Sequence, residues 1–300
     1  MADIAEARRR LGRVGAGLMV QIAPAAEWRA SVRRVEEAGY GTAWVNETIG
    51  GREALTQMGV LLAASDRIAV GSAIANVWAR HPAAMQGGAS VLADSYPGRL
   101  ALGVGVSMNA VVERSGQKWE RPLGRMRAYL DRMDTAVESA PRPPVPFPRL
   151  VAALGPRMLE LARERADGAL PAAMPVEHTR RAREVLGPDR LLVVLQMAVL
   201  EPDLGAARRV VRESGILDVP DSPYTRALRG MGYGDADLAG GGTDALIDAR
   251  FALGGEAAVA ERIRAHLDAG ADHVCVTVPG PDLRSMTGLL ERLAPSLSGA

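Results

Sequence analysis

A glycine and a proline separate a predicted strand from a predicted helix in segment 153–158, which reads ALGPRM. Pro156 suits the first position of a helix, because the N–H that proline lacks would have no partner there. Gly155 lets an anion approach the backbone. The free N–H groups up to Met158 and the helix dipole attract negative charge. The positive charge of Arg157 strengthens this attraction. The segment is therefore a candidate phosphate site, although an ordinary helix start with a solvated arginine would have the same residues.

The loop after another predicted strand carries an amide, an indole, a guanidinium and an imidazole, in Asn76, Trp78, Arg80 and His81. Asn76 is suited to hydrogen-bond a heterocycle, and Trp78 to form the wall of a pocket for a planar molecule. Alternatively, Trp78 packs against a neighbouring helix. His81 precedes a proline, so we favour a helix cap over catalysis for it, although it remains a candidate at the mouth of a pocket.

Segment 103–109 contains closely spaced glycines without a complete nucleotide-binding motif. No further glycine or lysine follows Gly105 at the spacing of a dinucleotide fingerprint or a P-loop. Asn109 stands where a nucleophile elbow needs its last glycine. We interpret the segment as a close approach of the backbone to a ring system.

Side chains for metal or acid–base chemistry are few. The four histidines have no metal-ligand spacing, and neither HExxH nor CxxC is present, so we expect no metal. Glu47 follows a predicted strand and is the carboxylate with the best position for catalysis. The alternative for Glu47 is a salt bridge at the rim of the fold.

These segments all lie where predicted strands end. Short apolar runs alternate with helical patterns, such as the face formed by Trp28, Val32 and Val35. The predicted strands are 14–20, 42–46, 68–74, 99–105, 150–154, 167–171, 190–200 and 272–278. Eight strands, each followed by a helix, predict an α/β protein with a (β/α)8 barrel, in preference to a doubly wound open sheet. In such barrels the carboxyl ends of the strands carry the function.

The whole chain, 1–300, is expected to form one barrel domain with a helical insertion at about 201–254, after the seventh strand. The insertion contains Gly240, Gly241 and Gly242, and it would move as a lid over a bound substrate.

Composition excludes several classes of function. The net charge is +1 and aromatic residues make up 4%, so we expect no nucleic-acid partner. The basic run from Arg8 to Arg10 is interpreted as a solvated face of a frayed terminus. No apolar run is long enough to cross a bilayer, and no signal peptide is visible. The single cysteine, Cys275, lies in an apolar run and fits an inert core thiol. A cytoplasmic protein is the expectation.

Several segments, taken together and in order along nearly the whole chain, resemble the luciferase-like monooxygenase superfamily, in its branch of oxidoreductases that depend on coenzyme F420. They are EAGYGTAWVNE at 37–47, ASDRIAVGS at 64–72, RHPAAM at 80–85, YPGRLALGVG at 96–105, GPRML at 155–159, RADG at 165–168, PVEHT at 175–179 and AHLDAGADHV at 265–274.

The resemblance implies an enzyme that transfers a hydride between the C5 atom of the deazaflavin and a small organic substrate. The cofactor phosphate would lie on the amides around Gly155 to Met158. A non-prolyl cis peptide at Ala73-Ile74 would support the ring. The resemblance also implies ring contacts by Asn76, Val106 and Ser107, an acidic group at Glu47 and a homodimer.

The sequence departs from this resemblance at Thr48, where some members have a histidine that acts in acid–base chemistry. The proton donor is therefore open, with Asn109, His81 and Glu113 as alternatives to that histidine. The candidate catalytic residues are Glu47 and Asn109, and Thr48, Trp78 and His81 are expected in the substrate pocket. FMN is the alternative cofactor, in a monooxygenase on the same barrel. A non-catalytic protein that binds the deazaflavin is a further alternative.

Overall fold

Eight parallel strands close into a barrel in the computed structural model, which describes residues 2–20, 22–215 and 221–299. The last strand, β10, pairs with both β8 and β1 and so closes the sheet. The predicted barrel is confirmed, and the doubly wound open sheet is excluded. The barrel strands are β1 (Val14–Gly17), β2 (Thr42–Val45), β3 (Ala69–Ser72), β5 (Leu100–Gly105), β6 (Arg149–Val151), β7 (Gly168–Ala169), β8 (Leu191–Leu200) and β10 (His273–Thr277).

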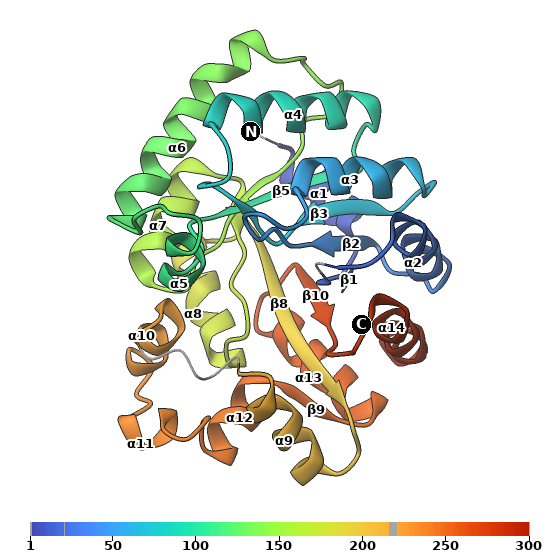
Figure 1. Ribbon diagram of the computed structural model, residues 1–300, viewed down its shortest axis with the longest axis vertical. Coiled ribbons are helices and arrows are strands. Elements are labelled where there is room, and N and C mark those ends of the chain that lie inside the picture. Colours follow the sequence, from blue (N-terminus) through green and yellow to red (C-terminus); the bar gives the residue numbers. More distant parts are fainter. Residues whose placement is uncertain (1, 21, 216–220, 300) are drawn as a thin grey trace.

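Helices surround these strands (Figure 1). The predicted apolar face of Trp28, Val32 and Val35 is buried against the barrel, as expected for an amphipathic helix. The helices of the ring are α2 (Ala25–Glu37), α3 (Ala54–Ala63), α4 (Pro82–Ser95), α6 (Pro122–Ala136), α7 (Pro156–Arg165), α8 (Val176–Leu186), α13 (Glu256–Asp268) and α14 (Leu283–Leu297). The short helices α5 (Asn109–Glu113) and η1 (Val137–Ser139) lie within connections.

Two short strands and an N-terminal helix differ from the expectation. β4 (Ala75–Asn76) pairs with β5, and β9 (Ala252–Gly254) pairs with β8. Neither strand was expected, because the sequence placed 75–76 in the loop after a strand and 252–254 in the insertion.

The basic run is part of a helix, α1 (Ile4–Leu11), whose Ala7 and Leu11 are buried. Arg8 pairs with Asp272 at 2.8 Å, while Arg9 and Arg10 both pair with Glu6. The expectation of a frayed terminus is therefore wrong, because Ala7 and Leu11 on either side of the arginines dock the helix. The expectation of a solvated face holds for Arg9 and Arg10, which are exposed.

The insertion after β8, the seventh barrel strand, is helical as expected. It contains α9 (Leu204–Glu213), α10 (Pro223–Arg229), α11 (Asp235–Leu238) and α12 (Asp244–Arg250), which gather at one end of the molecule in Figure 1. Residues 216–220 of the expected insertion lie outside the described residues. The three glycines between α11 and α12 all have positive φ, from 59° to 88°, a conformation that glycine adopts without a steric cost.

Three buried histidines predict that the protein loses stability in mild acid. Burial lowers the pKa of His266 to about 3 and that of His273 to about 4, and burial also lowers the pKa of His178. His273 Nε2 accepts a hydrogen bond from the indole of Trp44 at 2.9 Å, which requires the unprotonated atom. Below pH 6.5 the histidines take up protons in the unfolded state, while His266 and His273 stay unprotonated in the folded state down to pH 5, so the folded state loses stability as the pH falls.

We therefore expect the free energy of unfolding to fall between pH 6.5 and pH 5, by up to about 1.4 kcal/mol per pH unit for each histidine. Urea unfolding at a series of pH values measures this slope. The carboxylates with lowered pKa values stay ionised in this window and do not contribute. A free energy of unfolding that is constant from pH 6.5 to pH 5 would contradict the prediction.

Candidate active site

A cavity of about 380 Å³ lies at the carboxyl ends of the barrel strands, where the barrel rule places function. The loops after β2, β3, β5, β6 and β7 contribute to its wall, and α10 of the insertion covers it. Of the residues expected at the site, the cavity brings together Glu47, Thr48, Ala73, Ile74, Val106, Ser107, Gly155 and Met158.

The peptide between Ala73 and Ile74 is cis and lines this cavity, as the resemblance implies. Gly105 lies behind it and does not itself line the cavity. A Cβ atom on Gly105 would be 2.8 Å from Cγ1 of Ile74. The close approach that the glycine allows is thus to the Ile74 side chain and not to a ligand ring.

The start of α7 presents unpaired backbone donors beside the cavity. Gly155 is the N-cap, and no side chain caps the helix. The N–H groups of Met158 and Leu159 both bond to the Gly155 carbonyl at 3.1 Å. Among the described residues, the N–H groups of Gly155 and Arg157 have no hydrogen-bond partner. Pro156 and Arg157 are exposed and do not line the cavity, so this site offers backbone amides and the helix dipole in place of a side-chain cation.

Glu47 contacts the cavity through a side chain that is only 2% exposed. Its Oε1 accepts from the N–H of Ala54 at 3.1 Å, and its Oε2 accepts from the N–H of Asn76 at 2.7 Å. The guanidinium of Arg80 donates to both oxygens and also pairs with Glu53. Glu47 thus forms the salt bridge at the rim of the fold that the sequence offered as the alternative to a catalytic role. Proton transfer by Glu47 stays a prediction.

Asn76 lies one layer behind the cavity wall. It is fully buried, and its Oδ1 accepts from the N–H of Trp78 at 3.0 Å. Its Nδ2 is buried without a hydrogen-bond partner in the described chain. An unpaired buried amide is costly, so it suggests an acceptor from outside the described chain.

Trp78 and His81 do not line this cavity and instead line a second one on the outer side of the same loop. The indole of Trp78 donates to the carbonyl of Val106 at 2.9 Å, and the indole of Trp119 donates to the same oxygen at 3.1 Å. His81 is the N-cap of α4 and accepts from the N–H of Ala83 at 3.2 Å, which confirms the favoured interpretation. Asn109 is exposed at the start of α5, outside the lining of both cavities.

Other residues line the cavity that no sequence motif indicated. Tyr224 and Arg226 come from α10, Trp119 from the segment before α6, and Val111 from α5. Only the capping box of Ser222 and Thr225 is visible in the sequence. It predicts that a helix starts there, but it does not predict that this helix, α10, lies over the barrel. Burial raises the pKa of the Tyr224 phenol, so this hydroxyl stays protonated at neutral pH.

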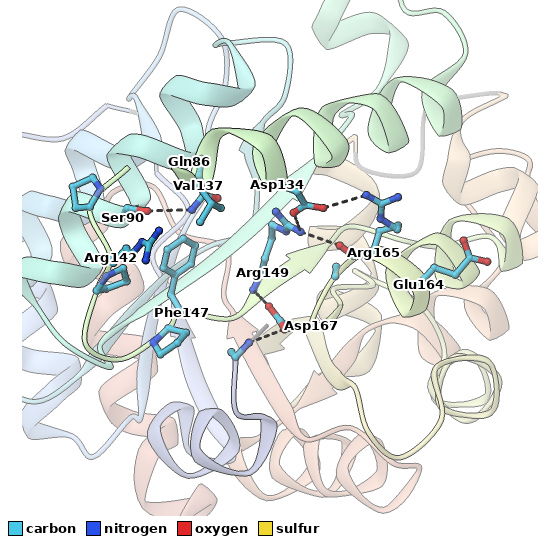
Figure 2. A pocket seen from close by; sticks show the side chains of 15 residues that line it. Gln86, Ser90, Asp134, Val137, Arg142, Phe147, Arg149, Glu164, Arg165 and Asp167 are labelled. Atoms are coloured by element: carbon cyan, nitrogen blue, oxygen red, sulfur yellow. Dashed lines mark hydrogen bonds and ion pairs between the residues drawn. The ribbon is translucent and has the colours of Figure 1, made fainter. Parts of the chain in front are cut away.

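A larger cavity of about 500 Å³ lies at the opposite end of the barrel, near the starts of β6 and β7 (Figure 2). Its polar groups are joined to one another. Asp167 accepts from the N–H groups of Ala2 and Arg149 at 3.0 and 2.9 Å, and Arg149 pairs with Asp134 at 2.7 Å. These contacts tie the N-terminus and the barrel strands together, and this end of a barrel serves stability.

Within residues 2–20, 22–215 and 221–299, no three side chains of histidine, cysteine, aspartate or glutamate gather as a metal site. The same residues form no helix with the length and apolar character that a bilayer crossing needs. Cys275 is buried, as expected for a core thiol.

Comparison with known proteins places this barrel among related folds. A family model described as luciferase-like monooxygenase matches residues 10–187, more than half of the chain. A 5,10-methylenetetrahydromethanopterin reductase of Archaeoglobus fulgidus is 26% identical over 155 residues, which are 46% of this chain and 47% of that protein. The alignment thus spans about half the length of this relative.

Two solved structures share the fold over nearly the whole chain. An F420-dependent secondary alcohol dehydrogenase, in complex with an F420–acetone adduct, has a TM-score of 0.74 and 16% identity, and covers 95% of this chain and 98% of that one. The oxygenating constituent of 3,6-diketocamphane monooxygenase from Pseudomonas putida, in complex with FMN, has a TM-score of 0.65 and 15% identity. The match covers 94% of this chain and 98% of that one.

Proposed function

Because the chain belongs to the luciferase-like monooxygenase family, we propose that it is an oxidoreductase that binds coenzyme F420 and transfers a hydride between the deazaflavin and a small organic substrate. One observation carries the proposal. A single cavity at the strand ends combines the apolar wall of Ala73 and Ile74 with the start of α7, where, among the described residues, the N–H groups of Gly155 and Arg157 are unpaired.

The residues of the cavity suit a flavin-type group. Its volume of about 380 Å³ falls within the range of small-molecule sites. A Cβ atom on Gly155 would meet nothing within 4 Å, so the space beside the free amides is open. The unpaired Nδ2 of Asn76 adds a buried donor behind the Ala73-Ile74 wall. These features match a phosphate at α7 and a heterocycle against the cis peptide.

The chain supplies binding, orientation and exclusion of water. When bound, the deazaflavin supplies a hydride acceptor or donor at its C5 atom. The amides at the start of α7 would hold the phosphate, and the ion pair of Glu47 and Arg80 fixes the segments that follow β2 and β4 in the wall of the cavity. Tyr224 on α10 covers the cavity, and its protonated phenol donates a hydrogen bond to a polar group of the substrate.

FMN is the second candidate cofactor. A structure with the same fold holds FMN, and the phosphate of FMN would suit the same helix start. The F420-dependent secondary alcohol dehydrogenase, which has the same fold, supports the deazaflavin. The homodimer stays a prediction, because the structure describes a single chain.

Titration of the purified protein with F420 and, separately, with FMN tests the proposal by absorption spectroscopy. We expect saturable binding of F420 at a lower concentration than FMN. Reduced F420 is then mixed with a panel of enones, imines and aldehydes, and its oxidation by at least one of them is expected.

Two outcomes would contradict the proposal in different ways. Tight binding of FMN without binding of F420 would favour a monooxygenase. Tight binding of F420 without its oxidation by any compound of the panel would favour a non-catalytic protein that binds the deazaflavin.

A further inference from the structure

Trp78 and His81 line a second cavity, of about 470 Å³, between the start of α4 and one face of α6. This cavity shares no lining residue with the candidate active site. Its lining contains three arginines and one histidine, Arg80, Arg125, Arg132 and His81. We call it the basic pocket.

No carboxylate lines the basic pocket. Arg80 is neutralised by Glu47 and Glu53. In the described part of the chain, neither Arg125 nor Arg132 lies within ion-pair distance of an acidic side chain, whereas Arg127 on the same helix pairs with Glu164 at 3.2 Å. The pocket therefore has an excess of positive charge that the protein itself does not compensate.

The donors in the basic pocket are held in place. The guanidinium of Arg125 lies 3.9 Å from the ring centroid of Trp78, a cation–π contact that orients it. The Nδ1 atom of His81 accepts from the N–H of Ala83, so the neutral ring carries its proton on Nε2 and can donate it. The pocket also lies at the start of α4, where the helix dipole favours negative charge.

We propose that the basic pocket binds a small free oxyanion of the phosphate or carboxylate type, through the guanidinium groups of Arg125 and Arg132. Planar guanidinium groups suit such anions, because they form charge-assisted hydrogen bonds to two oxygens at once. The site is separate from the deazaflavin cavity, and its occupation does not require a cofactor.

Two contacts join the basic pocket to the cavity wall. The indole of Trp78 donates to the carbonyl of Val106, and Arg80 holds the carboxylate of Glu47. Both Val106 and Glu47 line the active-site cavity. Trp78 and Arg80 therefore connect the basic pocket to the wall of the active site.

Isothermal titration calorimetry with inorganic phosphate tests the site on the protein without added cofactor, at constant ionic strength maintained with chloride. The variants are Arg125→Gln and Arg132→Gln. The matched control is Arg127→Gln, which removes the same charge from the same helix but on the face paired with Glu164. We expect saturable binding to the wild type and to the control, and affinity lower by roughly tenfold or more in each of the two pocket variants.

Phosphate that binds equally to Arg125→Gln, Arg132→Gln and the control would lie elsewhere, as at the start of α7, and would overturn the proposal. A lack of saturable binding to the wild type would overturn it as well. All three arginines are exposed, so the variants are expected to fold, and their thermal unfolding checks this. The result is independent of the proposed function, because no cofactor is used.

Discussion

An aspartate in place of Gly155 is expected to abolish cofactor binding while leaving the fold intact. Gly155 has φ −88° and ψ 158°, an extended conformation that any residue adopts, and a Cβ atom there would meet nothing within 4 Å. An aspartate at an N-cap accepts hydrogen bonds from the first amides of the helix, which stabilises the helix by a few tenths of a kcal/mol relative to glycine. The same carboxylate would occupy the amides that the phosphate needs and would repel its charge.

We expect the affinity of Gly155→Asp for F420 to fall by roughly 100-fold to 1,000-fold, since about two charge-assisted hydrogen bonds are lost. Its free energy of unfolding should be unchanged or slightly higher. Spectroscopic titration and urea unfolding measure the two quantities.

Gly155→Asn is the matched control, because asparagine caps the helix equally well without a charge. It should lose less affinity than the aspartate variant. Wild-type affinity in Gly155→Asp would show that the segment is an ordinary helix start, which was the alternative interpretation.

Local patterns in the sequence predicted the parts of the site that depend on neighbours in the chain. The Gly155-Pro156 pair marks the start of α7, and His81 before Pro82 marks the cap of α4. Apolar runs located all eight barrel strands, because buried parallel strands are nearly continuous in apolar residues. The predicted strands were mostly longer than the observed ones, since the apolar character continues into the loops that line the cavity.

Contacts between distant segments were not predictable in the same way. Glu47 and Arg80 are 33 positions apart, and nothing local indicates that they pair. Trp78 was placed in the substrate pocket because it follows a strand, yet its side chain turns to the face with Arg125. Tyr224 covers the cavity only because the insertion folds back over the barrel. Which distant residues pair, and which face a side chain takes, depends on how whole helices and strands pack together.

A methionine in place of Arg80 is expected to destabilise the protein by about 3–5 kcal/mol, the usual cost of removing one partner from a buried ion pair. The Glu47 side chain is 2% exposed and that of Arg80 is 12% exposed, so the carboxylate would stay buried with only the N–H groups of Ala54 and Asn76 as donors. Methionine keeps the apolar stem of the arginine and therefore limits the loss of packing. Urea unfolding at pH 7 measures the change.

The double variant Glu47→Gln/Arg80→Met should recover most of this loss, because it leaves no buried charge uncompensated. Arg127→Met is the control for a surface pair. Arg127 and Glu164 are 47% and 48% exposed, and the loss of such a pair costs less than about 1 kcal/mol. If Arg80→Met costs no more than this control, Glu47 does not need Arg80 to stay in place. Its carboxylate would then be available for the proton transfer that the sequence suggested, and its role as an anchor of the cavity wall would be refuted.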